Sequence, residues 1–130
     1  MTGRRLVTMT VNAIVRMLLL VLGVNFVTSA LAIAAGDFDA VALPSEMMTM
    51  EFWANLLSGI GWLLVLILSF RRRSELAPAL AVFLAGAFLF DVLTTWPLAL
   101  PLPPGFLYWG SAVVCLQLLC AAWLARRQLS

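Results

Sequence analysis

The sequence predicts an all-α membrane protein with four transmembrane helices in an up-down-up-down bundle with short loops. Hydrophobic residues make up 64% of the 130 residues and charged residues only 11%, against about a quarter in an ordinary soluble domain. Four apolar stretches are each long enough to cross a bilayer, which needs about 20 residues per helix. All basic residues are Arg, and they cluster at the ends of these stretches. We therefore expect a single membrane domain over residues 1–130.

The first span is predicted over residues 17–36, with Arg16 at its boundary. Apolar residues before it alternate with polar and basic ones, so residues 1–16 are one candidate for an interfacial helix. Alternatively, the span begins near Val11 and Arg16 reaches back to the surface. A third interpretation is a secretory signal, because a basic start and a Leu-rich run precede Ser29, Ala30, Leu31 and Ala32, which resemble a small-residue cleavage site. Its removal would leave three spans.

Three further spans follow with short connections. The second is predicted over residues 52–70, where two aromatic residues mark one membrane interface and residues 71–73, all Arg, end the span. The third is predicted over residues 76–98, with Pro78 in its first turn, where a missing N–H costs nothing. The fourth is predicted over residues 106–125, after a proline-rich connection that cannot be helical throughout.

The distribution of charge predicts the orientation. The four predicted spans place all eight Arg, together with Glu75, on one side of the membrane. Four acids fall in the loop on the other side: Asp37, Asp39, Glu46 and Glu51. Because positive charge marks cytoplasmic loops, we expect a multi-pass protein of the bacterial inner (plasma) membrane with both termini in the cytoplasm. The basic side chains expected to contact lipid headgroups are Arg16, Arg71, Arg72 and Arg73. Nothing in this pattern indicates nucleic-acid binding.

The residue types also exclude several chemistries. The chain has no His, and all its basic residues are Arg, so neither His-ligated metals nor lysine Schiff bases are possible. Cys115 and Cys120 lie about 140° apart around one helix, so they do not pair easily. The soft thioether groups of Met47, Met48 and Met50 would suit copper, but apolar contact is the favoured interpretation of these residues and of both cysteines. We expect no cofactor, no metal and no enzymatic activity.

Asp91 is the one acid predicted deep within a span. It lies roughly 22 Å from the arginine-rich boundary and about 8 Å from the opposite edge of the hydrocarbon layer. An ionised carboxylate at this depth is costly unless it is paired or hydrated. Asp91 is therefore expected to be protonated or to face a polar pocket, and Glu51 would join it only by dipping into the membrane. The polar residues expected near Asp91 are Asn25, Thr28, Asn55, Ser58 and Thr95.

Other small and polar residues are predicted to hold the helices together. Gln117 lies in the middle of the fourth span, and Asn25, at similar depth, is its expected hydrogen-bond partner. Gly59 and Gly61 in the second span are expected to let neighbouring helices approach closely.

Two functions are consistent with this pattern. The first is a non-catalytic membrane subunit or accessory protein that assembles with copies of itself or with a larger membrane complex. The alternative is a small oligomeric proton-coupled transporter or channel that uses Asp91. These interpretations differ in whether Asp91 binds a proton or substrate, or only clasps the helices together.

Overall fold

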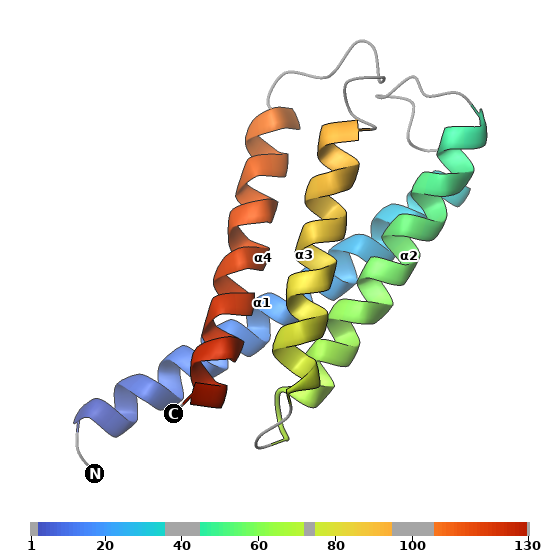
Figure 1. Ribbon diagram of the computed structural model, residues 1–130. Coiled ribbons are helices and arrows are strands. Elements are labelled where there is room, and N and C mark those ends of the chain that lie inside the picture. The colour runs from blue at the N-terminus through green and yellow to red at the C-terminus, as the bar shows by residue number, and fades with distance from the viewer. Residues whose placement is uncertain (1–2, 36–44, 72–74, 95–105, 130) are drawn as a thin grey trace.

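The computed structural model describes residues 3–35, 45–71, 75–94 and 106–129 (Figure 1). These residues form four helices: α1 (Gly3–Ala34), α2 (Ser45–Leu68), α3 (Leu76–Thr94) and α4 (Phe106–Leu129). Each helix is long and apolar enough to cross a membrane. The predicted all-helical membrane class is confirmed to this extent, and the four helices indicate a multi-pass membrane protein.

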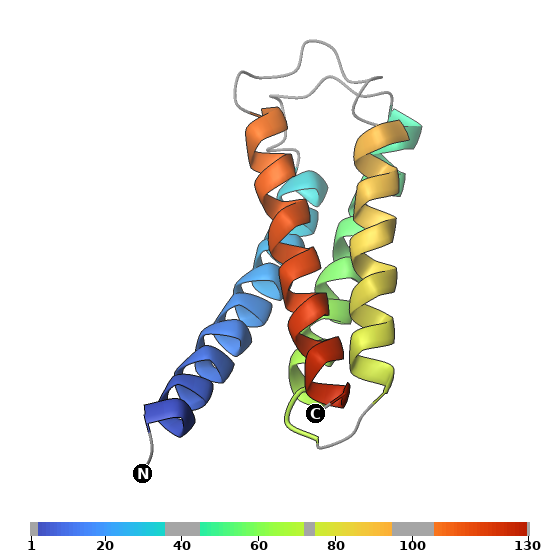
Figure 2. The same cartoon turned by 60° about the vertical axis from the view of Figure 1, so that its left-hand side comes forward.

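The helices differ in extent from the predicted spans. α1 is continuous over 32 residues, about 48 Å at 1.5 Å per residue, compared with a hydrocarbon core of about 30 Å. The predicted interfacial segment and the first span therefore form one helix. Its first residues, 3–11, are exposed, and Figures 1 and 2 both show this part extending away from the other helices. Residues 95–98, at the predicted end of the third span, lie outside the described residues.

The start of α2 is the difference that matters most for function. α2 begins at Ser45 rather than at residue 52. Glu51, assigned from the sequence to a loop, is therefore a helical residue in the second turn. Its side chain has a fixed direction relative to the bundle.

Glycine residues set the close packing of α1 on α2. A Cβ added to Gly59 would lie 2.9 Å from the Gly23 carbonyl O, and one added to Gly23 would lie 2.6 Å from Leu63 Cδ2. On the α3 side, a Cβ at Gly61 would lie 2.8 Å from Leu84 Cδ2. These distances confirm the predicted close approach at Gly59 and Gly61, because no larger residue fits without movement.

The core lies where apolar faces of the four helices meet. α1 packs mainly on α2 and α4 mainly on α3, whereas contacts between α1 and α4 are the fewest of those observed. The rings of Phe26 and Phe88 meet edge to face, with 5.4 Å between their centroids. Fully or nearly fully buried members of the core include Leu19, Leu22, Phe26, Trp62, Val65, Ala81, Cys120 and Leu124.

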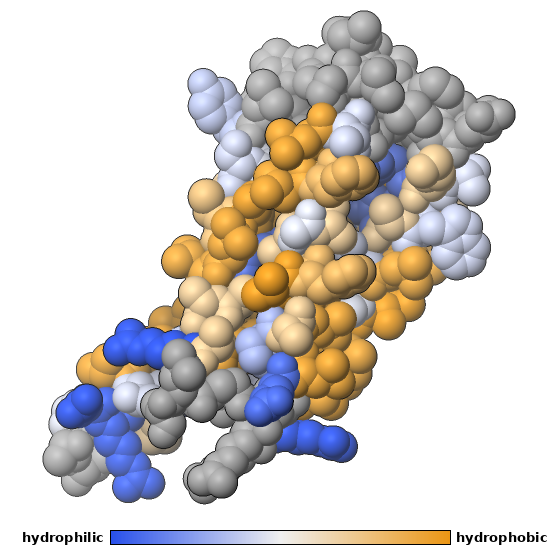
Figure 3. Space-filling model, viewed as in Figure 1, coloured by the Kyte–Doolittle hydropathy of each residue, from blue (hydrophilic) through white to orange (hydrophobic). Residues whose placement is uncertain are grey.

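The outer surface of the bundle is largely apolar (Figure 3). Threonine hydroxyls on this surface bond to their own helices: Thr10 Oγ1 donates to the Leu6 carbonyl at 2.9 Å, and Thr94 Oγ1 to the Phe90 carbonyl at 2.7 Å. Such bonds satisfy hydroxyl groups without water. This surface is suited to a lipid environment, where apolar side chains and internally bonded polar groups are both stable.

Candidate functional site

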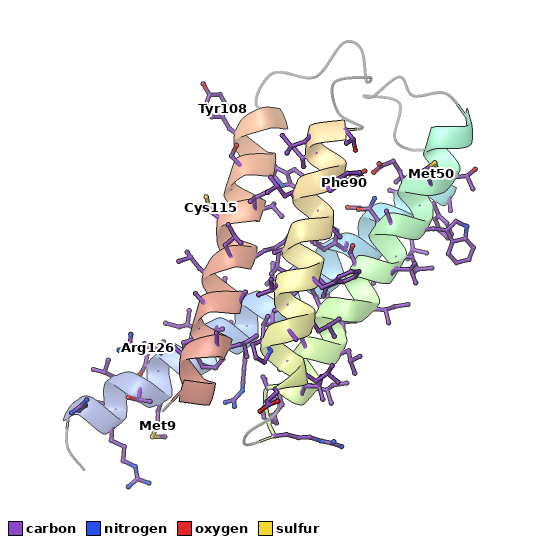
Figure 4. All side chains as sticks on the ribbon, viewed as in Figure 1. Met9, Met50, Phe90, Tyr108, Cys115 and Arg126 are labelled. Atoms are coloured by element: carbon purple, nitrogen blue, oxygen red, sulfur yellow. The ribbon has the colours of Figure 1, made fainter. Side chains whose placement is uncertain are left out.

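The carboxyl groups of Glu51 and Asp91 form a hydrogen bond between α2 and α3. Glu51 lies near the start of α2, and Asp91 lies three residues before the end of α3. Both residues are partly buried. Figure 4 labels Met50 and Phe90, the residues preceding the two acids, on the facing ends of these helices. We refer to this end of the bundle as the acidic end.

The surroundings of the acid pair are polar on one side and apolar on the other. Asn55 lies one turn after Glu51, and its Nδ2 donates a 2.7 Å hydrogen bond to the Glu51 backbone carbonyl. Phe88, one turn before Asp91 on α3, is buried. Figure 3 shows hydrophilic atoms between the adjoining ends of α2 and α3, with apolar side chains around them. The pair is thus partly shielded from the outside but lies close to an end of the bundle.

No positive charge neutralises the pair within the described residues. Arg4, Arg5, Arg71 and Arg126 are exposed, and Arg16 contacts a different part of α2. A carboxylate can only accept a hydrogen bond, so two carboxyl groups that bond to each other must hold a proton between them. The geometry therefore brings two carboxyl groups, one from α2 and one from α3, together at one site.

The sequence anticipated Asp91 but expected amides and hydroxyl groups as its main partners. The structure gives it a second carboxyl group. This contact was expected only under one alternative, in which Glu51 lies within the membrane. A signal was present in the sequence: Glu51, Asn55 and Ser58 recur at spacings of four and three, which places them on one face of a helix.

The remaining predicted site residues are placed differently. Asn55 is bonded beside Glu51, and Ser58 is partly buried one turn further along α2. On α1, Asn25 is partly buried, whereas Thr28 is exposed and its Oγ1 donates to the Asn25 carbonyl at 3.0 Å. A role for Asn25, Thr28 or Ser58 at the acid pair stays a prediction. Thr95 lies outside the described residues.

Arg16 joins α1 to the end of α2. Its Nε donates to Ser69 Oγ at 3.3 Å and its Nη2 to the Ser69 carbonyl at 3.1 Å. The guanidinium carbon also lies 4.3 Å from the centre of the Phe70 ring. A cation at the last carbonyls of a helix is favoured by the helix dipole, and stacking on an aromatic ring adds to this. We call this region the arginine end.

The four predicted lipid contacts are therefore only partly described. Arg16 has the protein partners given above, although a guanidinium has five N–H donors and only two hydrogen bonds to Ser69 are observed. Arg71 is exposed just after α2, while Arg72 and Arg73 lie outside the described residues. Binding of lipid headgroups by these side chains stays a prediction.

The core also holds two buried side chains with hydrogen-bonding groups, and the prediction for one of them, Gln117, was wrong. Gln117 and Trp62 are both 0% exposed. Neither amide atom of Gln117 has a hydrogen-bond partner among the described residues, so the expected bond to Asn25 is not formed; Trp62 Nε1 has no partner either. The prediction used depth alone, but α1 and α4, which carry the two amides, have few contacts with each other.

Comparison of the chain with family models, curated proteins and solved structures finds no match. The function is therefore inferred from the acid pair, the core and the charge distribution of the chain itself.

Proposed function

We propose that this protein binds and releases protons at the Glu51–Asp91 pair and is a small proton-coupled membrane transporter. The contact between two carboxyl groups is the observation that carries this proposal. Two acids at one place in a membrane protein are costly when both are ionised, because like charges repel in a medium of low polarity. Gain or loss of one proton therefore changes the local charge, and with it the packing of α2 on α3.

The position of the pair suits such a role. Each acid lies on a different helix, so deprotonation generates repulsion across the α2–α3 contact. Coupled transport requires that the charge state of a site biases one arrangement of helices over another. A hydrogen bond inside one helix would not have this effect.

We also propose the orientation in which this site works. The helices would cross the membrane in alternating directions, with the arginine end in the cytoplasm of a bacterial cell and the acidic end outside. Protons would then reach the pair from the outer side. The chain is expected to act as an oligomer, because a bundle of four helices encloses little room for a substrate path.

Proton exchange by the purified protein in liposomes tests the function. The variants Glu51→Gln and Asp91→Asn remove one carboxyl group each while keeping its shape, and Glu75→Gln is the matched control because Glu75 is exposed at the arginine end. We expect substrate-independent proton uptake after a pH jump for the native chain and the control, and its loss in both pair variants. Unchanged uptake in either pair variant would rule the proposal out.

A role as a membrane subunit that docks on a partner helix is the second candidate. Its specific support is Gly86 on α3, where an added Cβ would meet nothing within 4 Å. Phe83 and Phe90 are exposed one turn away on either side. An exposed glycine of this kind allows another helix to approach closely. If Gly86→Leu prevents assembly and leaves proton uptake intact, the docking role exists beside the proton site.

A further inference from the structure

The first part of α1 projects beyond the bundle at the arginine end. Residues 3–11 are exposed, and the hydrogen bonds from Arg16 to Ser69 tie α1 to α2 just after them. Residues 3–16 are about 21 Å long at 1.5 Å per residue. Figures 1 and 2 both show α1 running obliquely to α3 and α4, so its N-terminal part lies apart from the other helices. This part is therefore open to its surroundings.

The charged and most of the polar side chains of this segment lie on one face. With residues placed at intervals of about 100°, Arg4, Arg5, Thr8, Asn12 and Arg16 fall within a sector of roughly 120°. Further along the same helix, the buried residues occupy the same sector: Leu19, Leu22, Gly23, Phe26 and Ala30. The side of α1 that faces the bundle is thus apolar after Arg16 and polar before it.

The opposite side of the segment is apolar. Leu6, Val7, Ile14 and Met17 lie within a sector of roughly 100° on this side, and each is more than half exposed. Thr10 lies among them, but its hydroxyl donates to the Leu6 carbonyl and needs no water. We call these four residues the apolar face. Such a face is unfavourable in water and favourable against hydrocarbon.

The oblique course of α1 turns the two faces in the directions that a membrane surface requires. Because α1 leans away from the bundle toward its N-terminal end, its bundle-facing side is turned partly away from the membrane interior there (Figures 1 and 2). The apolar face is turned partly toward the interior. The same inclination lets a helix of about 48 Å stay in contact with a hydrocarbon core of about 30 Å.

Charge identifies the kind of lipid. α1 carries Arg4, Arg5 and Arg16 and no acidic residue, so the segment bears only positive charge. A second copy of the same segment placed alongside it would bring like charges together, which is unfavourable. Anionic headgroups, in contrast, attract the basic residues of an interfacial helix.

We propose that residues 3–16 of α1 bind the membrane surface at the arginine end through anionic lipid headgroups. The apolar face enters the boundary of the acyl chains, and Arg4 and Arg5 contact the headgroup phosphates. Arg16 stands at the junction, where the membrane-crossing part of α1 begins. The segment thereby anchors α1 in its inclined position and distinguishes anionic bilayers from neutral ones. This binding is separate from the proton function, because the acid pair takes no part in it.

Spin labels on the two sides of the helix test where this segment lies. In the full chain with both native cysteines replaced by Ala, Leu6→Cys carries a label on the apolar face and Thr8→Cys a label on the polar side. Both positions are exposed, so the labels leave the bundle undisturbed. In vesicles of phosphatidylcholine and phosphatidylglycerol, oxygen should relax mainly the label at residue 6, and a water-soluble nickel chelate mainly the label at residue 8. Equal access of the chelate to both labels would overturn the proposal.

The label at residue 6 also tests the role of charge, because it reports the ratio of immersed to water-exposed segments. In the mixed vesicles, Arg4→Gln and Arg5→Gln should each lower this ratio about fivefold, the equivalent of about 1 kcal/mol per basic residue at a charged surface. Arg126→Gln is the matched control, since it removes one exposed Arg from α4 and leaves α1 unchanged. In phosphatidylcholine alone, all these chains should give equal ratios. A native ratio that is the same in both kinds of vesicle would rule out anionic headgroups as the partner.

Other occupants of the apolar face give different results. If a second copy covers it, immersion of the label at residue 6 will rise with the protein-to-lipid ratio. If an acidic protein covers it, the purified chain will leave this label open to the nickel chelate in every vesicle. Either result would contradict binding to lipid. Neither measurement uses proton uptake, so failure of this inference leaves the Glu51–Asp91 proposal standing, and loss of that proposal leaves this inference standing.

Discussion

Replacing Gly59 by Ala should weaken the packing of α1 on α2. The added Cβ would lie 2.5 Å from Val27 Cγ2, and 2.9 Å from both the Gly23 carbonyl O and the Val27 backbone N. Two of these three atoms belong to the backbone of α1. Rotation of a side chain cannot relieve the overlap, so the two helices would have to move apart.

Gly86→Ala is the matched control for this substitution. Both changes replace Gly by Ala inside a helix and therefore share a gain of about 0.5–1 kcal/mol from the lower flexibility of the unfolded chain. An added Cβ at Gly86 meets nothing within 4 Å. The difference between the two variants isolates the cost of overpacking, which we expect to be about 1–3 kcal/mol.

Reversible unfolding in lipid–detergent micelles, followed by helical circular dichroism, measures this difference. Gly61→Ala and Gly23→Ala should fall between the two variants, because their closest overlaps are with the flexible side-chain ends of Leu84 and Leu63. Equal free energies of unfolding for Gly59→Ala and Gly86→Ala would refute the close α1–α2 packing.

Two further predictions concern the arginine end. Arg16→Lys keeps the charge but loses the paired bonds to Ser69 and the stacking on Phe70, so the free energy of unfolding should fall by about 1 kcal/mol; a variant as stable as the native chain would show that Arg16 does not join α1 to α2. Glu75→Cys, in a chain with both native cysteines replaced by Ala, should react with a membrane-impermeant maleimide in inverted vesicles and not in intact cells. Labelling in intact cells would contradict the proposed orientation.

The fold class could be predicted because the bilayer imposes a simple length rule. Four apolar stretches of the required length become four helices, whatever their detailed contacts. The starts of α1 and α2 were harder to predict. Residues 3–16 contain no helix-breaking proline, and their polar side chains alone do not prevent α1 from beginning at Gly3. Similarly, an acidic composition suggested a loop up to Glu51, although the helix already begins at Ser45.

The depth of the candidate site along the helices could be predicted, but the helix faces that form it could not. Counting along each span gives an approximate depth for each residue, and this singles out Asp91 as an acid within a span. Depth does not say which helices are neighbours or which faces meet, and this is why Asn25 was assigned to Gln117. Position around the helix axis would have been the better guide, because Glu51, Asn55 and Trp62 lie on one face of α2 and this face is directed into the core.

Infrared spectroscopy of the carboxyl groups tests the acid pair most directly. At neutral pH the native protein and the Glu75→Gln control should show the C=O band of a protonated carboxylic acid. This band should disappear in both Glu51→Gln and Asp91→Asn, because an amide can donate to the remaining carboxylate and no shared proton is needed. Absence of the band in the native protein, or its persistence in both variants, would contradict a proton shared by Glu51 and Asp91.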